Sequence, residues 1–278
     1  WTSYSTVPVD RQPDMRLPLV LLVDGGPWAR DRFGYDNGRQ WLANRGYAVL
    51  AVNFRGSTGF GKAFLAAARG EWGAKMDDDL IDAVEWAVAS GVADPARIAI
   101  MGGSYGGYAV LSGMTRSPHV YACGVDVVGP SSLETLMASI PPYWEAQRVM
   151  LYHAVGDPRT EAGAALLRER SPLYRADRIA RPLLIGQGAN DPRVLQSEAD
   201  QMVAALHANA VPVTYVLYPD EGHGFVRPAN RLSFNAVVEA FLARHLGGRF
   251  QPVSPGEFDG TTMEVREDSG GVATMPVA

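Results

Sequence analysis

Short apolar segments recur along this chain and are separated by longer amphipathic ones. The apolar segments are LPLVLLVDGG, YAVLAVNF, RIAIMGG, CGVDVVGP, PLLIGQG and VTYVLYPDEG. Short runs rich in β-branched and aliphatic residues indicate strands that are buried on both faces, as in a parallel sheet. Alternation of such strands with helices predicts a three-layer α/β fold with a mostly parallel central sheet. At 278 residues the chain is long enough to build this fold around a large core.

The clearest predicted helix is the segment MDDDLIDAVEWAVASG, residues 76–91. Its apolar residues recur on one face, and its acidic run lies at the helix start, where the helix macrodipole favours negative charge. Gly91 fits the C-terminal stop of this helix. Further helices are predicted over residues 38–45, 105–116, 161–170, 196–209 and 231–246.

The two ends of the chain depart from this pattern. The first residues, WTSYSTVPV, alternate as a strand does, and they carry neither an initiator methionine nor the features of a signal peptide. We therefore expect a fragment of a longer chain, from a soluble protein of the cytoplasm or the periplasm. Residues 1–249 are expected to form one α/β domain. Residues 250–278 are rich in Gly, Pro, Ser and Thr, and we expect an extended or partly disordered tail.

Charge and composition exclude several classes of function. The formal net charge of −5 and the sequence pI of about 5.6 leave no broad basic surface for nucleic acid. The apolar runs are far shorter than the roughly 20 residues of a membrane-spanning helix, so we expect no membrane span. The single cysteine, Cys123, is predicted to be a core thiol, and the five histidines lack metal-ligand spacing. The sequence therefore predicts no metal site and no cofactor.

One serine lies between two pairs of glycines. The segment Gly102-Gly103-Ser104-Tyr105-Gly106 follows an apolar strand-like run and opens a helix-like one. It fits the pattern G-x-S-x-G, which in a strand–turn–helix context forms the nucleophile elbow of α/β-hydrolases. Glycines allow the sharp turn and the close packing of helix against strand that leave the serine hydroxyl exposed. We therefore predict that Ser104 is a catalytic nucleophile; the alternative is an ordinary glycine-rich turn.

A serine nucleophile needs a base and an acid that orients the base, and both candidates follow later in the chain. Asp191 comes after the strand-like run PLLIGQG, and His223 comes after VTYVLYPDEG. Loops at the carboxyl ends of strands are where open α/β sheets build their sites. The sequence therefore predicts a triad of Ser104, Asp191 and His223. Asp220 and Glu221 remain as alternatives to Asp191, because both lie in the DEGH segment.

Acyl transfer to serine also needs donors for the oxyanion, which are usually two backbone N–H groups. The residue after the nucleophile, Tyr105, supplies one of them. The loop DGGPW follows an early strand, and Gly26 in this loop is the candidate for the second. A plain β-turn is the alternative for DGGPW.

Several motifs in order resemble those of one enzyme family. The segments DGGPW, NFRGSTGFG, GGSYGG, GANDPRV and DEGHGF together resemble the catalytic domain of the prolyl oligopeptidase (S9) family of serine peptidases, over residues 2–249. The segments RGSTGFG and GGSYGGY are most similar to sequences of the acylaminoacyl-peptidase-like branch. The resemblance implies an α/β-hydrolase fold, the same triad, and oxyanion donors at the amides of Tyr105 and Gly26.

The resemblance also implies residues for substrate binding. Arg193 corresponds to an arginine that grips a main-chain carbonyl of the substrate in some members. The pocket for the side chain before the cleaved bond is implied to include Val194, Val128, Tyr143 and Trp144. Plain hydrophobic core is the alternative for these four residues.

Two positions depart from the family pattern. Many relatives have histidine where this chain has Asp24, so a contact made by that histidine is not expected here. In GFG, Phe60 stands where we expect prolyl oligopeptidases and dipeptidyl peptidases to carry a tyrosine that helps to bind the oxyanion. Phenylalanine cannot donate that hydrogen bond. We therefore expect the site to use backbone amides and Phe60 to form an apolar wall of the pocket.

The function predicted from these residues is hydrolysis of short peptides by a serine peptidase, through an acyl-enzyme on Ser104. A carboxylesterase with the same triad is one alternative, and a catalytically silent binding module is another. Family members usually carry an N-terminal β-propeller that screens the active site, and no such sequence is present in this chain. The resemblance implies that the full-length protein contains one.

Overall fold

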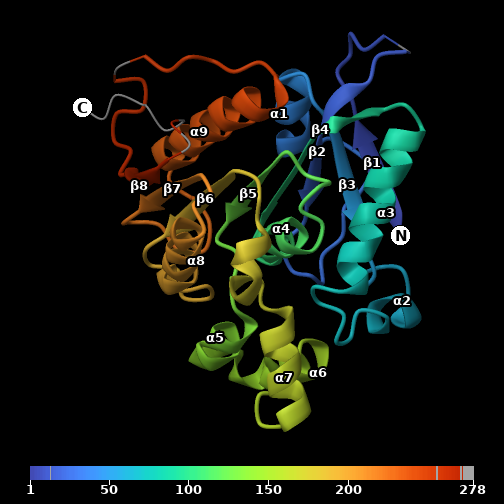
Figure 1. Cartoon of the computed structure of the whole chain (residues 1–278), viewed down its shortest axis with the longest axis vertical. Helices are drawn as coiled ribbons and strands as arrows, with labels where there is room; N and C mark the ends of the chain where they lie inside the picture. Colours follow the sequence, from blue (N-terminus) through green and yellow to red (C-terminus); the bar gives the residue numbers. More distant parts are fainter. Residues whose placement is uncertain (13, 255, 270, 272–278) are drawn as a thin grey trace.

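The computed structural model describes residues 1–12, 14–254, 256–269 and 271, and its centre is an eight-stranded sheet (Figure 1). The strand order is β1-β3-β2-β4-β5-β6-β7-β8. The strands are β1 (Thr2–Thr6), β2 (Leu17–Val23), β3 (Ala48–Asn53), β4 (Ala93–Gly103), β5 (Cys123–Val127), β6 (Leu183–Gly188), β7 (Val213–Tyr218) and β8 (Glu264–Asp268). Each apolar segment of the sequence contains one of β2 to β7, so the prediction of an α/β fold is confirmed.

The sheet is parallel in its interior and antiparallel at both edges. Strands β2 to β7 pair in parallel with one another. In this register Leu21 of β2 lies between Leu50 of β3 and Ile100 of β4. Strand β1 pairs antiparallel with β3 at one edge, and β8 pairs antiparallel with β7 at the other. Because all six interior strands run the same way, their carboxyl ends meet along one side of the sheet.

Strand β8 lies within the segment that we expected to be an extended or partly disordered tail. The sequence analysis predicted no strand there, because the residues of β8 are mostly charged and lack an apolar period. A strand at a sheet edge needs a partner on one side only. The part of that tail beyond residue 271 lies outside the described residues.

Helices cover both faces of the sheet and complete three layers (Figure 1). One face packs on α1 (Asn37–Asn44) and α9 (Pro228–Leu246), and the other on α3 (Lys75–Ala89), α4 (Tyr105–Arg116) and α8 (Gln196–Ala208). Alternate residues of each strand therefore enter two separate cores. In β2, for example, Leu21 belongs to one core and Val20 to the other. The short helix α2 (Lys62–Ala66) follows β3.

A helical segment is inserted between β5 and β6 and projects from the sheet (Figure 1). We call residues 133–178 the roof segment. Its helices are α5 (Leu133–Ala138), η1 (Pro142–Gln147), α6 (Arg148–Ala154), α7 (Glu161–Arg170) and η2 (Pro172–Arg178). Of these, only α7 was predicted from the sequence.

The roof segment is fastened to the sheet domain by a buried carboxylate. Glu198 of α8 accepts hydrogen bonds from the backbone N–H groups of Ser131 and Ser132, both at 2.9 Å. It also accepts one from the Ser131 hydroxyl at 3.0 Å. The start of the segment is also joined to the end of α7, because the Leu133 N–H donates to Ser171 Oγ at 2.8 Å. Glu198 therefore fixes the point at which the roof segment leaves the sheet.

No helix within the described residues combines the length and the apolar character needed to cross a membrane.

Candidate active site

Ser104 lies on a tight turn between β4 and α4. Its backbone has φ 57° and ψ −117°, a conformation that non-glycine residues rarely adopt. The Ser104 N–H donates to the Val127 carbonyl at 2.8 Å, which ties the turn to β5. The flanking glycines are needed for space, since a Cβ at Gly102 would lie 2.6 Å from the carbonyl carbon of Gly106, and one at Gly106 would lie 2.2 Å from the Val23 oxygen. This is the geometry that the motif predicted.

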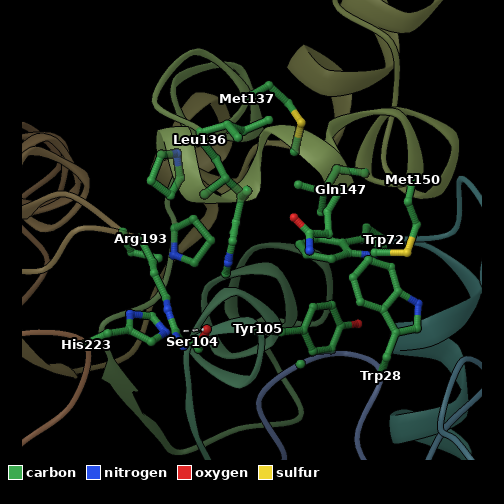
Figure 2. Close-up of a pocket in the computed structure, with 17 residues that line it drawn as sticks. Trp28, Trp72, Ser104, Tyr105, Leu136, Met137, Gln147, Met150, Arg193 and His223 are labelled. Carbon is green, nitrogen blue, oxygen red and sulfur yellow. Dashed lines mark hydrogen bonds between the residues drawn. The ribbon is translucent and has the colours of Figure 1, made fainter.

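His223 joins Ser104 to Asp191 in a chain of hydrogen bonds. Its Nε2 lies 2.9 Å from Ser104 Oγ (Figure 2). Its Nδ1 lies 2.7 Å from Asp191 Oδ2. Asp191 follows β6 and His223 follows β7, so both lie at the carboxyl ends of strands. The structure thus brings together the three residues that the sequence placed far apart.

The Asp191 carboxylate is held on both of its oxygens. Oδ1 accepts from the backbone N–H groups of Arg193 and Val194 at 2.8 and 3.0 Å, while Oδ2 faces the His223 ring. The Asp191 side chain is fully buried, whereas 14% of the His223 side chain is exposed. The carboxylate therefore fixes the imidazole through Nδ1, while Nε2 faces Ser104 at the cavity.

The two alternative acids face away from His223. The carboxylate of Glu221 accepts from Asn230 Nδ2 at 2.9 Å and from two backbone N–H groups just before α9, at 2.8 and 3.0 Å. Asp220 bonds the side chains of Asn230 and Thr262, and the Thr262 hydrogen bond is the largest of the effects that lower the pKa of Asp220. Within the described residues neither carboxylate reaches the histidine. Both instead stabilise the start of α9.

Two backbone N–H groups beside Ser104 are free to donate. Neither the Gly26 amide nor the Tyr105 amide donates a hydrogen bond to any residue that the structure describes. The loop that carries Gly26 lies against the elbow, since a Cβ placed on Gly25 would lie 3.7 Å from Ser104 Cβ. Gly26 itself has φ 132°, a backbone conformation that favours glycine. Both residues line the same cavity as Ser104.

A cavity of about 330 Å³ opens beside Ser104. Figure 2 shows His223 and Arg193 on one side of it, Trp28, Trp72 and Met150 on the other, and Leu136 and Met137 of the roof segment above. Its other lining residues are Gly26, Ser104, Tyr105, Pro130, Ile140, Pro141, Trp144, Gln147, Leu151 and Val194. Most of these side chains are apolar or aromatic, so the cavity suits an apolar group.

Three of the residues that the resemblance assigned to substrate binding line this cavity. They are Arg193, Val194 and Trp144. The guanidinium carbon of Arg193 lies 5.6 Å from the centre of the Trp144 ring, within the range of a cation–π contact. Arg193 also sits two residues after Asp191, so its backbone holds the acid while its side chain faces the cavity.

The other three are placed differently from the expectation. Tyr143 does not line the cavity; it is 55% exposed and packs edge-on against Trp144. Val128 is 3% exposed and belongs to the core side of its turn, where its N–H donates to the Gly186 carbonyl at 2.9 Å. Phe60 also lies outside the cavity, because its ring packs on Phe64 and under the guanidinium of Arg30. A ring held in that contact is not a wall of the Ser104 pocket.

Asp24, the other departure from the family pattern, directly follows β2 and does not line the cavity. Burial and the neighbouring Asp36 raise the pKa of Asp24. Burial likewise raises the pKa of Asp31 to about 6. Within the described part of the chain, neither carboxyl group forms a hydrogen bond with Ser104, Asp191 or His223.

The sequence analysis missed most of the roof of the cavity. Leu136, Met137, Met150 and Leu151 come from α5 and α6, whose sequence LETLMASIPPYWEAQRVMLYHA has no regular helical period. Trp72 carried no signal of its own, as it stands in a short Gly-flanked turn. Trp28 was included in the DGGPW motif, and that motif was the only sequence signal for this part of the wall.

The model of the prolyl oligopeptidase family matches residues 33–249 of the chain. That stretch includes Ser104, Asp191 and His223. The chain belongs to the prolyl oligopeptidase family. The family predicted from the motifs is therefore confirmed, and with it the α/β-hydrolase fold.

Peptidases named for different substrates are similar to this chain. Dipeptidyl aminopeptidase BIII of Pseudoxanthomonas mexicana is 60% identical over 99% of this chain and 41% of its own length. The acylamino-acid-releasing enzyme of Arabidopsis thaliana is 30% identical over 76% of this chain and 28% of its own length. A solved puromycin-hydrolyzing peptidase of Mycobacterium tuberculosis superimposes with a TM-score of 0.82, at 32% identity, over 91% of this chain and 38% of its own.

The chain thus spans about two fifths or less of the length of these prolyl oligopeptidase family members. Residues 33–249, which match the family model, contain strands β3 to β7, the residues Ser104, Asp191 and His223, and the roof segment.

Proposed function

We propose that this chain is the catalytic domain of a serine peptidase that hydrolyses short peptides through an acyl-enzyme on Ser104. The observation that carries the proposal is the hydrogen-bonded chain from Ser104 Oγ through His223 to Asp191, at 2.9 and 2.7 Å. It lies at the mouth of an apolar cavity beside two unpaired backbone donors. A nucleophile, a base, an orienting acid and an oxyanion site are the parts that acyl transfer requires.

In the first half of the reaction, His223 Nε2 takes the proton of the Ser104 hydroxyl as Oγ attacks the peptide carbonyl carbon. Asp191 accepts a hydrogen bond from Nδ1–H and stabilises the imidazolium that forms. The carbonyl oxygen becomes an oxyanion, which accepts hydrogen bonds from the Tyr105 and Gly26 amides. The imidazolium then gives its proton to the leaving amine, the C–N bond breaks, and the acyl group remains on Ser104.

In the second half, a water molecule takes the place of the leaving amine. His223 removes a proton from this water as its oxygen attacks the acyl carbon, and the same two amides hold the oxyanion again. The proton passes from His223 to Ser104 Oγ as the ester bond breaks. The products are a free carboxylic acid and the regenerated enzyme, so no cofactor enters the balance.

The cavity supplies the binding of the acyl part of the substrate. Trp144, Val194 and the apolar side chains of α5 and α6 surround the side chain that precedes the cleaved bond. Arg193 is placed to donate to a main-chain carbonyl, because its guanidinium lines the cavity close to the nucleophile. The likeness to a dipeptidyl aminopeptidase at 60% identity supports release of dipeptides as the first substrate class to test.

We also propose that the full-length protein carries the N-terminal β-propeller usual in this family. The greater length of the relatives supports this, since the chain covers 41% of the dipeptidyl aminopeptidase. A propeller over the active site would restrict substrates to short peptides.

The test is a hydrolysis panel with the full-length protein and with its Ser104→Ala variant. The panel contains dipeptidyl, acyl-aminoacyl, free-carboxyl-end and simple ester substrates, and the products are identified by mass spectrometry. We expect peptide cleavage by the unmodified protein and none by the variant. Cleavage of the esters alone would make the protein a carboxylesterase. If no substrate is turned over, the protein is a catalytically silent binding module.

A further inference from the structure

A second cavity lies directly beyond the wall of the first. It has a volume of about 770 Å³ and shares Trp28, Trp72 and Met150 with the Ser104 cavity. In Figure 2 these three side chains lie together on the side of the first cavity opposite His223. The second cavity is otherwise formed by Pro27, Thr58, Lys62, Leu65, Ala66, Ala68, Arg69, Val149, His153 and Ala154. It therefore lies between α2 and α6, next to the loop that carries Gly26.

The charged residues of the second cavity are all basic. Lys62, Arg69 and His153 line it, and none of the described aspartates and glutamates does so. The side chains of Lys62 and Arg69 are exposed and form neither a hydrogen bond nor an ion pair with any residue that the structure describes. Two cations without partners beside an apolar surface create a positive potential in the cavity.

The nearest carboxylates by sequence already have partners. Glu71 forms an ion pair with Lys75 at 3.2 Å. Asp157 binds Arg159 through both oxygens, at 2.7 and 2.9 Å, and hydrogen bonds from Arg159 are the main cause of its lowered pKa. Neither acid neutralises Lys62 or Arg69. The positive charge of the cavity is therefore available to a ligand.

We propose that the second cavity binds a carboxylate of the peptide substrate through Lys62 and Arg69. The inference rests on the proposed peptidase function, because the shared wall places this cavity next to the site of acylation. Leu65, Val149 and Met150 give the ligand an apolar surface, and the two cations recognise its charged end. The carboxylate is that of an acidic side chain or that of the peptide C-terminus.

Binding is measured by calorimetry on full-length Ser104→Ala protein, which does not consume its ligand. The probes are alanine pentapeptides with an amidated C-terminus and with glutamate or glutamine at each position in turn. The all-alanine pentapeptide with a free and with an amidated C-terminus forms the second arm. The first arm detects an acidic side chain, and the second detects the terminal carboxylate.

The test variant is Lys62→Gln with Arg69→Gln, in the same background. Its matched control is Arg231→Gln, since Arg231 is likewise exposed, lies on α9 and lines neither cavity. Exposed ion pairs typically contribute about 1.4-fold to fivefold in affinity each. We therefore expect one charged probe to bind about threefold to tenfold more tightly than its neutral counterpart. The double variant should lose this preference, and the control should keep it.

The dependence of the charge preference on salt concentration tests the same interaction independently. Raising the salt concentration from about 0.05 to 0.5 M should reduce the preference, since the two cations are exposed and their fields are screened. The neutral probes should show little change in affinity.

Equal affinity for charged and neutral probes at every position would overturn the proposal, and so would a preference that survives in the double variant. Failure of the peptidase function has a different signature. In that case the unmodified protein does not cleave the neutral pentapeptides, whatever the charge dependence of binding.

Discussion

The proposed catalytic groups and the roof of the cavity are held in different ways. Ser104, Asp191 and His223 follow three strands of one sheet, and hydrogen bonds of 2.7 to 3.0 Å fix each of them. The roof segment comes from a single insertion between β5 and β6. It meets the sheet domain at the joint around Glu198 and also at Arg170, whose carbonyl accepts from the Tyr108 hydroxyl and whose guanidinium donates to the Gly73 carbonyl. The sheet thus fixes the reacting atoms, while the shape of the pocket depends on how one inserted segment is fastened.

This difference implies that the two regions respond differently to substitution. A change in the catalytic group should remove turnover without loss of stability. A change at the joint should alter substrate binding and stability together, and leave the chemistry of a small ester nearly intact.

The largest effect is expected for Ser104→Ala. Loss of the nucleophile should lower kcat for any peptide by about 10⁴-fold or more, because the remaining groups cannot form an acyl-enzyme. The substitution removes one hydroxyl at the cavity and leaves no void in the core, so thermal unfolding should be unchanged. Ser197→Ala, at an exposed serine with no hydrogen bond to the described residues, is the control. Turnover near that of the unmodified protein would remove Ser104 from the mechanism.

The next effect is expected at the joint, for Glu198→Gln. The Ser131 and Ser132 N–H groups and the Gln201 amide all donate to one oxygen of Glu198, Oε2, and the Thr135 hydroxyl donates to the other, Oε1. A glutamine can keep its oxygen at the first position, but its NH₂ group then faces the Thr135 hydroxyl, and the negative charge that strengthens all these hydrogen bonds is lost. We expect a loss of about 2–4 kcal/mol in the free energy of unfolding. Because the roof segment is then less well positioned, KM for a peptide should rise by roughly tenfold with a small change in kcat.

A small ester does not fill the pocket, so its hydrolysis reports on Ser104, Asp191 and His223 and not on the roof segment. Its kcat/KM should change little in the Glu198→Gln protein at a temperature where the protein is folded. Glu85→Gln, at an exposed glutamate of α3 without a partner among the described residues, is the matched control. Equal losses on ester and peptide would show that the two regions are not separable.

A smaller effect on turnover is expected for Asp126→Asn, which should instead change how the free energy of unfolding depends on pH. Asp126 lies where the two regions meet, buried in β5 against Gly107 of α4, with Oδ1 accepting from the Gly129 N–H at 2.9 Å. Burial raises its pKa from 3.8 to about 8. The folded protein therefore holds a proton there more tightly than the unfolded chain does. This contribution to stability is complete below about pH 4 and is lost as the pH rises through 8.

Asparagine keeps the acceptor for Gly129 and cannot ionise. Each pH unit between pH 5 and the pKa of about 8 lowers the stability of the unmodified protein by about 1.4 kcal/mol, so Asp126→Asn should gain about 4 kcal/mol in the free energy of unfolding relative to it between pH 5 and pH 8.5. Denaturant unfolding at the two pH values measures this gain. A difference between the proteins that is the same at both would mean that Asp126 does not titrate in this range.

The smallest effect is expected for Phe60→Tyr. A correctly aligned oxyanion donor is worth about 10²-fold in kcat. Because the Phe60 ring contacts Arg30 and Phe64 and does not line the Ser104 cavity, we expect less than about a twofold change in kcat. Steady-state kinetics on one peptide is sufficient. A large increase would require Phe60 to reach the oxyanion and would show that the two backbone amides are not the whole of the site.

The elements that the sequence predicted well are those with a strong local period or a strict local motif. The helix expected over residues 76–91 is present as α3, and the helix expected over 105–116 matches α4 residue for residue. The elbow at Ser104 was predictable because glycine is sterically required at Gly102 and Gly106. Asp191 and His223 followed from the rule that loops at the carboxyl ends of parallel strands meet.

The elements that were missed depend on contacts distant in sequence. Helices α5 and α6 are short, and they exist because they pack over the cavity, so their residues carry no period of their own. Phe60 and Val128 were assigned from the family resemblance, which locates a loop but does not show which of its side chains face the site. Glu198 gave no signal, because a glutamate on a helix is usually solvated and only the fold brings it to Ser131.

Strand β8 has a consequence for how copies of this protein meet one another. It covers the edge of β7, whose sequence VTYVLY is apolar and rich in β-branched residues, the kind of edge that templates aggregation when it is exposed. The edge presented in its place is EVRED, with three acidic residues among five. Two such edges repel each other at neutral pH. The charged strand therefore opposes edge-to-edge pairing of two such sheets.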